Sequence, residues 1–518
     1  MIAERIVGVS EGQSHENGTL SLWAGAAAVA AAGAWILFDA SPGVNWLIWT
    51  ALAASGAMAL LQYLGRPLPP VSRGMMLVAI VIAGAAAITA NEFMYLLIVV
   101  SVALFLAMGM LLAQDARLDR ISLGFVLTAP VLAGARALFE SGSRVVDGSR
   151  LVRSPTAGAT LRGIAITAPV VLVFALLLAG ADPVFARWRD DFGRLFSNWT
   201  FLPRTAFFLV LLTVVLGAYG NMARLAEPRA STAAATKEAR RWLGTTERLI
   251  LLGSVAVLFW IFLGVQLSYL FGNLPRVVGS GMTFAEYARR GFAELSIVAT
   301  CTLVLIIVSE RYGKTNGRER LIRGLTIGIV LAVLLLLASA FHRVSLYEAA
   351  YGYTTARLYA QVYMIVVALT LVALAVEVVK GIDPGRLFRR AAVAALTALL
   401  VLLYWNHEAW IASENIARYA STKKLDPVYL TRDLSPNAVP TILRLLPTLP
   451  PPARDQLFAA VTSGYTGRVR LKPRAWYEWN LGRARAVRAL EAAGISLAPK
   501  PRQTVAPIPI PGTSQPTP

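Results

Sequence analysis

The sequence predicts an all-α protein: a polytopic transmembrane helical bundle of about eleven spans, followed by a small helical domain. Hydrophobic residues make up 56% of the 518-residue chain and charged residues only 15%, and the mean hydropathy is +0.60. This composition is typical of integral membrane proteins. The long apolar runs lack the alternating period of barrel strands, so helices are the expected spanning elements.

Apolar runs of about 17–25 residues are long enough to cross roughly 30 Å of hydrocarbon as helices. The polar residues 1–19 are expected to form an N-terminal segment in the cytoplasm, and the first run is long for a signal-peptide core, so we expect it to remain as a span. The predicted spans are 20–38, 46–64, 74–90, 94–113, 163–181, 205–221, 249–272, 291–308, 324–341, 358–378 and 388–405.

The basic residues indicate an orientation with the N-terminus inside and the C-terminus outside. They gather in alternate loops, at residues 66–73, 117–162, 224–248, 311–323 and 380–390. Retention of Lys and Arg on the cytoplasmic side orients a membrane protein during insertion. We therefore expect a multi-pass protein of a bacterial inner membrane, surrounded by the lipid bilayer.

Residues 114–162 are predicted to form a cytoplasmic loop between the first four spans (20–113) and a core of seven spans (163–406). Within this loop, 121–140 is apolar but contains Pro130 and Arg136. Counting it as a span would invert every later loop, so we interpret it as an interfacial or re-entrant helix.

Residues 407–497 follow the last span and are predicted to form an extracytoplasmic helical domain, because proline residues separate short amphipathic segments there. The final residues, 498–518, are rich in proline and poor in large apolar side chains. Such a tail cannot bury a core and is expected to be disordered.

Several classes of function are disfavoured. The net charge of +20 lies in the loops that orient the chain, so we expect no nucleic-acid partner. One cysteine, Cys301, and three scattered histidines, His15, His342 and His407, do not form a zinc motif. Gly313–Thr315 lacks the earlier glycine of a phosphate-binding loop. We therefore expect no cofactor and no metal.

Polar residues collect at the predicted outer ends of several spans and form the candidate functional patch. Glu286, Arg290 and Glu294 are four residues apart and would share one helical face. A carboxylate inside a span is costly unless it is paired or hydrated, which makes Glu294 a functional candidate. The full set is Asp182, Glu286, Tyr287, Arg290, Glu294, Arg343, Tyr347, Glu348, Tyr351, Arg357, Tyr359 and Asn406.

A structural interpretation of this patch competes with the functional one. Salt bridges and tyrosines commonly anchor helix ends at the membrane interface. The same holds for Gln62, Gln266, Gln361 and Glu377, which interhelical hydrogen bonds or snorkelling explain without a transport role.

Several blocks of the chain resemble a family of bacterial multi-pass membrane proteins, domain of unknown function four-one-seven-three with its sibling four-one-five-three. The similar blocks are 181–185, 283–295, 343–359, 406–419, 425–429 and 434–440, within residues 163–446. The resemblance implies a membrane protein with an exterior helical tail. It implies no activity.

Three functions follow as hypotheses. The first is a non-enzymatic membrane protein for envelope assembly or sensing, which binds an envelope protein or glycan through its outer face. The second is a secondary transporter or lipid-linked carrier, with Glu294, Arg290, Asp182 and Glu348 along a polar path. The third is an envelope glycosyl- or acyltransferase, with Asp182 or Glu348 as base.

Overall fold

The structure is a computed structural model that describes residues 2–113, 121–149, 201–225, 243–271, 292–381, 383–468 and 471–497. The elements are α1 (Ile2–Ile36), α2 (Val44–Tyr63), α3 (Pro70–Gly84), η1 (Ala85–Ala87), α4 (Glu92–Leu111), α5 (Leu123–Ser149), α8 (Phe201–Leu225), α9 (Thr245–Phe271), α12 (Phe292–Tyr312), α13 (Glu319–Tyr351), α14 (Thr355–Lys380), α15 (Pro384–Tyr404), α16 (His407–Thr422), η3 (Tyr429–Asp433), η4 (Pro436–Ala438), α17 (Val439–Leu445), η5 (Leu446–Thr448), α18 (Pro451–Tyr465), η7 (Trp476–Glu478) and α19 (Leu481–Ala492).

The all-α membrane fold is confirmed. Eleven helices of the described residues are long and apolar enough to cross a membrane. All but one of the predicted spans overlap one of these helices. The exception, 163–181, lies outside the described residues, and the remaining helix with the length and composition of a span is Leu123–Gly142 of α5.

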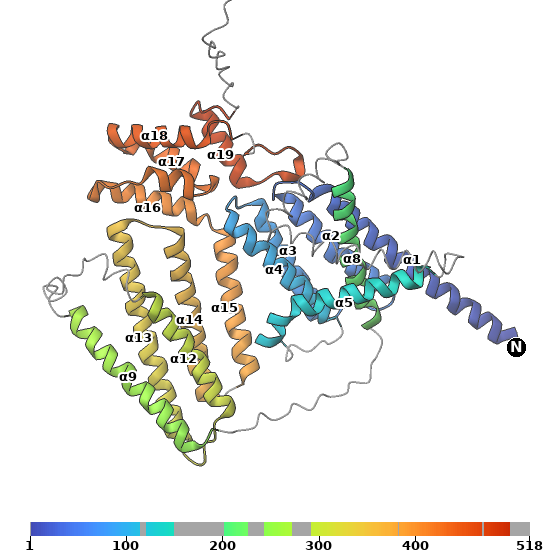
Figure 1. The fold of residues 1–518 in the computed structure, drawn as a ribbon, viewed down its shortest axis with the longest axis horizontal. Helices are drawn as coiled ribbons and strands as arrows, with labels where there is room; N and C mark the ends of the chain where they lie inside the picture. Colours follow the sequence, from blue (N-terminus) through green and yellow to red (C-terminus); the bar gives the residue numbers. More distant parts are fainter. Residues whose placement is uncertain are drawn as a thin grey trace, which may run out of the picture.

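The spanning helices form two groups that a C-terminal module joins (Figure 1). Helices α1–α5 and α8 share one core, which includes Ala26, Ala54, Met76 and Leu216. The second core joins α9, α12, α13 and α14 with the beginning of α15. A third core connects α3, α4, α14 and α15 to the module, which we define as residues 407–497. The module therefore packs on the ends of helices from both groups.

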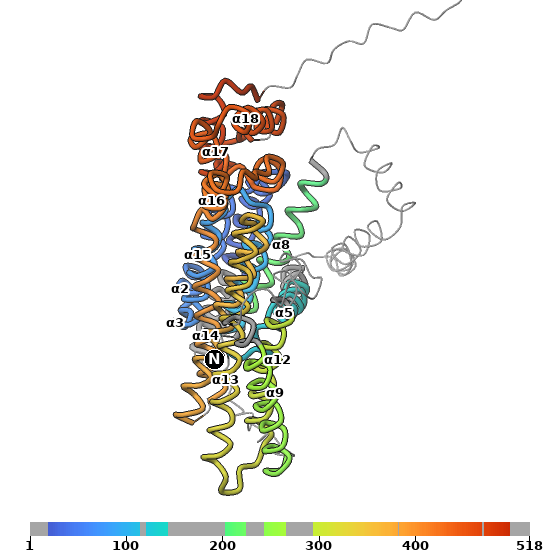
Figure 2. Tube along the Cα trace, turned by 90° about the vertical axis from the view of Figure 1, so that its left-hand side faces the viewer, coloured from blue at the N-terminus to red at the C-terminus, as the bar shows by residue number. Residues whose placement is uncertain are grey.

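Figures 1 and 2 show the module stacked on one end of the helices, which we call the module end. Helix α2 begins there, where the amide of Val44 donates to the carbonyl of Trp479 at 3.0 Å. The opposite end, the distal end, holds the α12–α13 loop. There, Lys314 and Leu243 make a backbone hydrogen bond of 2.9 Å.

Helix α5 lies across the direction of the long helices. Figure 1 draws it nearly at right angles to α13 and α14. It crosses α8 in backbone contact, since a Cβ atom on Gly217 would lie 1.9 Å from the carbonyl oxygen of Ala137. Only glycine permits this approach. The interpretation of 121–140 as an interfacial or re-entrant helix stays a prediction.

The end of α4 and the start of α8 lie at opposite ends of the helices. Helix α4 ends at the distal end, where Ser72 of α3 donates to the carbonyl of Gly109 at 2.6 Å. Helix α8 starts at the module end, since the rings of Phe207 and Phe38 are 5.7 Å apart. The predicted span 163–181 falls between these two helices in the sequence and stays a prediction.

Candidate functional site

The candidate patch is partly assembled at the module end. Asp182, Glu286, Tyr287 and Arg290 lie outside the described residues. Glu294 is exposed in the first turn of α12, and Arg343 is half-buried on α13. The structure brings together the remaining six residues, which surround the α13–α14 turn and the beginning of α16: Tyr347, Glu348, Tyr351, Arg357, Tyr359 and Asn406.

Helix α16 of the module holds the α13–α14 turn in place. Gly352 ends α13 with φ +91°, and a Cβ atom there would lie 2.5 Å from Oδ1 of Asn415. The Asn415 side chain accepts from the amide of Tyr353 and donates to its carbonyl, both at 2.8 Å. Thr354 caps α14 by accepting from the amide of Arg357. This pairing positions the first turn of α14.

Arg357 and two tyrosines form an aromatic and cationic stack. The Arg357 guanidinium lies 4.2 Å from the centroid of the Tyr347 ring, and the Tyr347 and Tyr351 rings are 4.8 Å apart. Arg357 also donates to the carbonyl of Gly352. A cation over an aromatic face is attracted by the ring quadrupole. These contacts fit the interpretation that the residues anchor helix ends.

Glu348 is the buried acid of the patch, with only 3% of its surface exposed. Gln361 of α14 donates to Oε2 of Glu348 at 2.8 Å, which is the interhelical hydrogen bond expected for Gln361. The other oxygen, Oε1, is buried and makes no hydrogen bond. Such an oxygen can accept a proton or contact a cation, and this is the chemistry that the carrier hypothesis requires.

His407 connects the patch to the module. Its Nδ1 lies 3.3 Å from the carbonyl oxygen of Trp405, and a carbonyl only accepts, so the neutral ring carries its proton on Nδ1. Nε2 then accepts from the Tyr359 hydroxyl at 3.0 Å. Phe93 of α4 stacks on Tyr359. Burial lowers the pKa of His407, and this effect outweighs the nearby Glu408 carboxylate, which raises it. The imidazole ring is therefore neutral near neutral pH.

Glu408, which the sequence analysis did not single out, is the centre of the module junction and is fully buried. Its Oε1 accepts from the Asn91 side chain at 2.8 Å and from the amide of Ser435 at 3.0 Å. Its Oε2 accepts from the Ser435 hydroxyl and from the Asn437 side chain at 3.3 Å. These four donors come from α4's cap and from η4, so one carboxylate links a span to the module.

Two asparagines complete this junction. Asn437 donates to the Thr89 hydroxyl at 3.1 Å and accepts from the amide of Ala90 at 3.2 Å. Asn480 caps α19 and donates to the carbonyls of Ala86 and Thr89 at 2.8 and 2.7 Å. We call Asn91, Glu408, Ser435, Asn437 and Asn480 the junction cluster. Because the polar groups of these residues pair with one another or with groups of the η1–α4 segment, the cluster fixes the module on the helix ends.

A cavity of about 430 Å³ opens at the module end between the α1–α2 loop and the module. Arg474 crosses it, with Nη1 3.0 Å from Oδ2 of Asp39, and its backbone amide donates to Glu478 at 2.9 Å. Hydrogen bonding to Asp39 and the nearby Glu478 raise the pKa of Arg474. Trp476, two residues from both Arg474 and Glu478, is 73% exposed.

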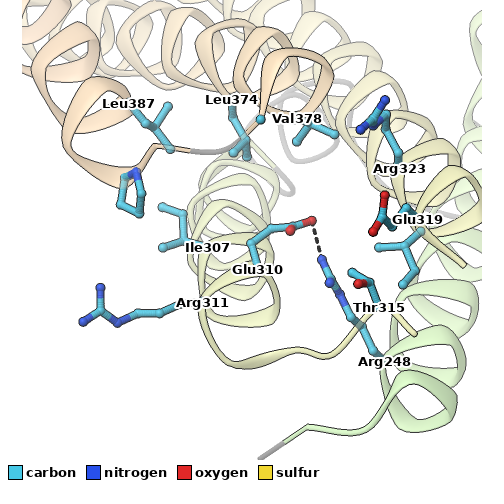
Figure 3. A pocket seen from close by; sticks show the side chains of 13 residues that line it. Arg248, Ile307, Glu310, Arg311, Thr315, Glu319, Arg323, Leu374, Val378 and Leu387 are labelled. Carbon is cyan, nitrogen blue, oxygen red and sulfur yellow. Dashed lines mark ion pairs between the residues drawn. The ribbon is translucent and has the colours of Figure 1, made fainter. Parts of the chain in front are cut away.

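A second cavity, of about 280 Å³, lies at the distal end among α9, α12, α13, α14 and α15 (Figure 3). Arg248 is buried there, forms an ion pair with Glu310 and donates from Nε to the Ser309 hydroxyl at 3.1 Å. Arg311, Thr315, Glu319 and Arg323 also line this distal cavity.

An ion-pair triad lies near this cavity in the α14–α15 turn. Glu377 is fully buried, and Arg386 binds both of its oxygens, with Nη2 2.7 Å from Oε2. Nη1 of Arg390 is 2.7 Å from Oε1 of Glu377. Each arginine remains about 40% exposed (40% and 39%). This bidentate pairing explains Glu377 as a structural residue.

The fold and these sites define a class of protein: a polytopic helical membrane protein whose C-terminal module is locked on the helix ends. No group of three or more His, Cys, Asp or Glu within the described ranges could hold a metal ion. The chain belongs to a family, since the model described as Domain of unknown function (DUF4153) matches residues 76–445. The sequence analysis named domain of unknown function four-one-seven-three first and four-one-five-three as its sibling. The family that matches is four-one-five-three. No curated protein and no solved structure matches the chain.

Proposed function

We propose that this protein is a non-enzymatic component of a bacterial inner membrane that binds an envelope protein or glycan through its module. The proposal begins with orientation. The helix ends and the α12–α13 loop at the distal end carry Arg311, Lys314, Arg318, Lys380 and other basic residues. By the positive-inside tendency, that end faces the cytoplasm and the module faces outside.

The observation that carries the proposal is the exposed Trp476, two residues along the chain from Arg474 and Glu478, which line the 430 Å³ cavity together with Asp39. Tryptophan and arginine dominate the energetics of recognition surfaces, and a cavity with a few polar groups gives orientation to a ligand. The junction cluster supports the same function, because a fixed module presents this surface without a cost for ordering it.

Photocrosslinking from position 476 tests the proposal. A photoreactive phenylalanine derivative replaces Trp476 in the full-length protein in cells. We expect a discrete adduct with a protein or a glycan, several-fold weaker in Arg474→Gln because Arg474 organises the cavity. The matched control carries the same probe at Val428, which is 56% exposed elsewhere on the module and should give little adduct.

Two results would count against the proposal. Adducts with lipid alone would make Trp476 an interfacial anchor, the usual role of tryptophan at membrane surfaces. Equal adduct yields from positions 476 and 428 would show that the cavity contributes nothing to recognition.

A further inference from the structure

The distal cavity combines an apolar wall with a charged rim. Ile307, Ile322, Leu374, Val378 and Leu387 form the apolar wall, and they come from four different helices. Arginine, glutamate and threonine side chains form the rim (Figure 3). A cavity of this kind suits a molecule with an apolar body and an ionic end.

The charges of the rim favour an anion. The Arg248–Glu310 ion pair is internally neutralised. What remains is one acid, Glu319, against two exposed cations, Arg311 and Arg323. Figure 3 shows Arg323 and Glu319 on the α13 side of the cavity and Arg311 on the opposite side. Further cations lie close in sequence, in the α12–α13 loop, at the start of α13 and at the end of α14: Lys314, Arg318, Arg320 and Lys380.

The level of the cavity along the helices matches a lipid headgroup. Arg311 lies in the last turn of α12, Arg323 in the second turn of α13, and Val378 in the last turn of α14. Exposed apolar side chains lie next to these positions, including Val308, Leu321 and Val379. An acyl chain could lie against them while the headgroup reached the cavity.

We propose that the distal cavity binds the phosphate of an anionic phospholipid, with Arg311, Arg323 and Thr315 as headgroup contacts. Basic pockets between transmembrane helices on the cytoplasmic side are suited to anionic headgroups, and guanidinium groups bind phosphate in bidentate geometry. The proposal is independent of the partner-binding function of the module.

Titration of the purified full-length protein with phosphatidylglycerol, followed by native mass spectrometry, tests the proposal. We expect Arg311→Gln/Arg323→Gln to weaken binding about tenfold or more. The control is Arg320→Gln, which removes an exposed cation from the first turn of α13 that does not line the cavity. A second variant, Thr315→Trp, obstructs the cavity without changing the charge and should also weaken binding.

Competition with inorganic phosphate distinguishes a lipid headgroup from a soluble phosphate as the ligand. If phosphatidylglycerol binds and millimolar inorganic phosphate does not compete, the ligand is a lipid headgroup, as proposed. Competition by inorganic phosphate would support a phosphate site but replace the lipid with a soluble ligand. The proposal would be overturned if Arg320→Gln weakened phosphatidylglycerol binding as much as the double variant, or if Thr315→Trp left binding unchanged. Either result would attribute the binding to surface charge and not to the cavity.

Discussion

Replacing Glu408 with alanine is expected to cost about 3–5 kcal/mol and to release the module from the helix ends. The substitution removes the acceptor of four hydrogen bonds, and the donors on Asn91, Ser435 and Asn437 remain in a buried junction. Buried donors without partners are costly, and here they belong to both sides of the junction. We therefore expect both a lower apparent unfolding temperature and faster proteolysis within the module.

Two variants control for this result. Glu414→Ala removes a partly exposed acid from the same helix and should change little. Glu408→Gln keeps one acceptor oxygen and should lie between wild type and Glu408→Ala. If Glu408→Ala and Glu414→Ala were equally protease-resistant, the junction cluster would not be what holds the module.

In the triad of Glu377, Arg386 and Arg390, loss of the two arginines is expected to destabilise the protein more than loss of the carboxylate. Removing both cations in Arg386→Gln/Arg390→Gln leaves the Glu377 carboxylate without its ionic partners, which is expected to lower the unfolding temperature clearly. Glu377→Gln leaves two arginines that are already partly exposed and can reach water. Its expected cost is only about 1 kcal/mol.

Thermal unfolding of the detergent-solubilised variants measures this asymmetry. Lys380→Gln, which removes an exposed cation from the end of the same helix, should behave as wild type. A larger drop in unfolding temperature for Glu377→Gln than for the double arginine variant would contradict the prediction, because the carboxylate would then not be the group that needs its ionic partners.

The spans could be predicted from the sequence because hydropathy is a local property. A run such as 94–113 can be recognised as a span from its own residues alone, because each residue must be compatible with hydrocarbon wherever the helix packs. The matching helix, Glu92–Leu111, differs only at its ends. There Asn91, which accepts from the amide of Met94, sets the start. Caps of this kind fix boundaries that hydropathy leaves open.

Local composition did not decide the orientation of α5. Its stretch 123–142 has the length and hydropathy of a span. Its direction depends instead on the close crossing of Ala137 and Gly217, residues eighty positions apart in the chain. Such a contact has no signature in either segment alone.

The junction cluster could not have been found from one sequence for the same reason. Asn91 and Glu408 are 317 positions apart, and Glu408 was only the first acid after the last span. The interhelical hydrogen bond predicted for Gln361 is present, because a polar group within a span generally pairs with a group on another helix. The partner, Glu348, was visible only in the structure.

We expect the module and the basic distal end to lie on opposite sides of the membrane. Single cysteines at Ser463 on α18 and at Lys314 in the α12–α13 loop, each in a Cys301→Ala background, can be labelled in intact cells with a membrane-impermeant thiol reagent. We predict labelling at position 463 and none at 314 until the cells are permeabilised. Labelling at 314 with protection at 463 would invert the topology and contradict an envelope-facing module.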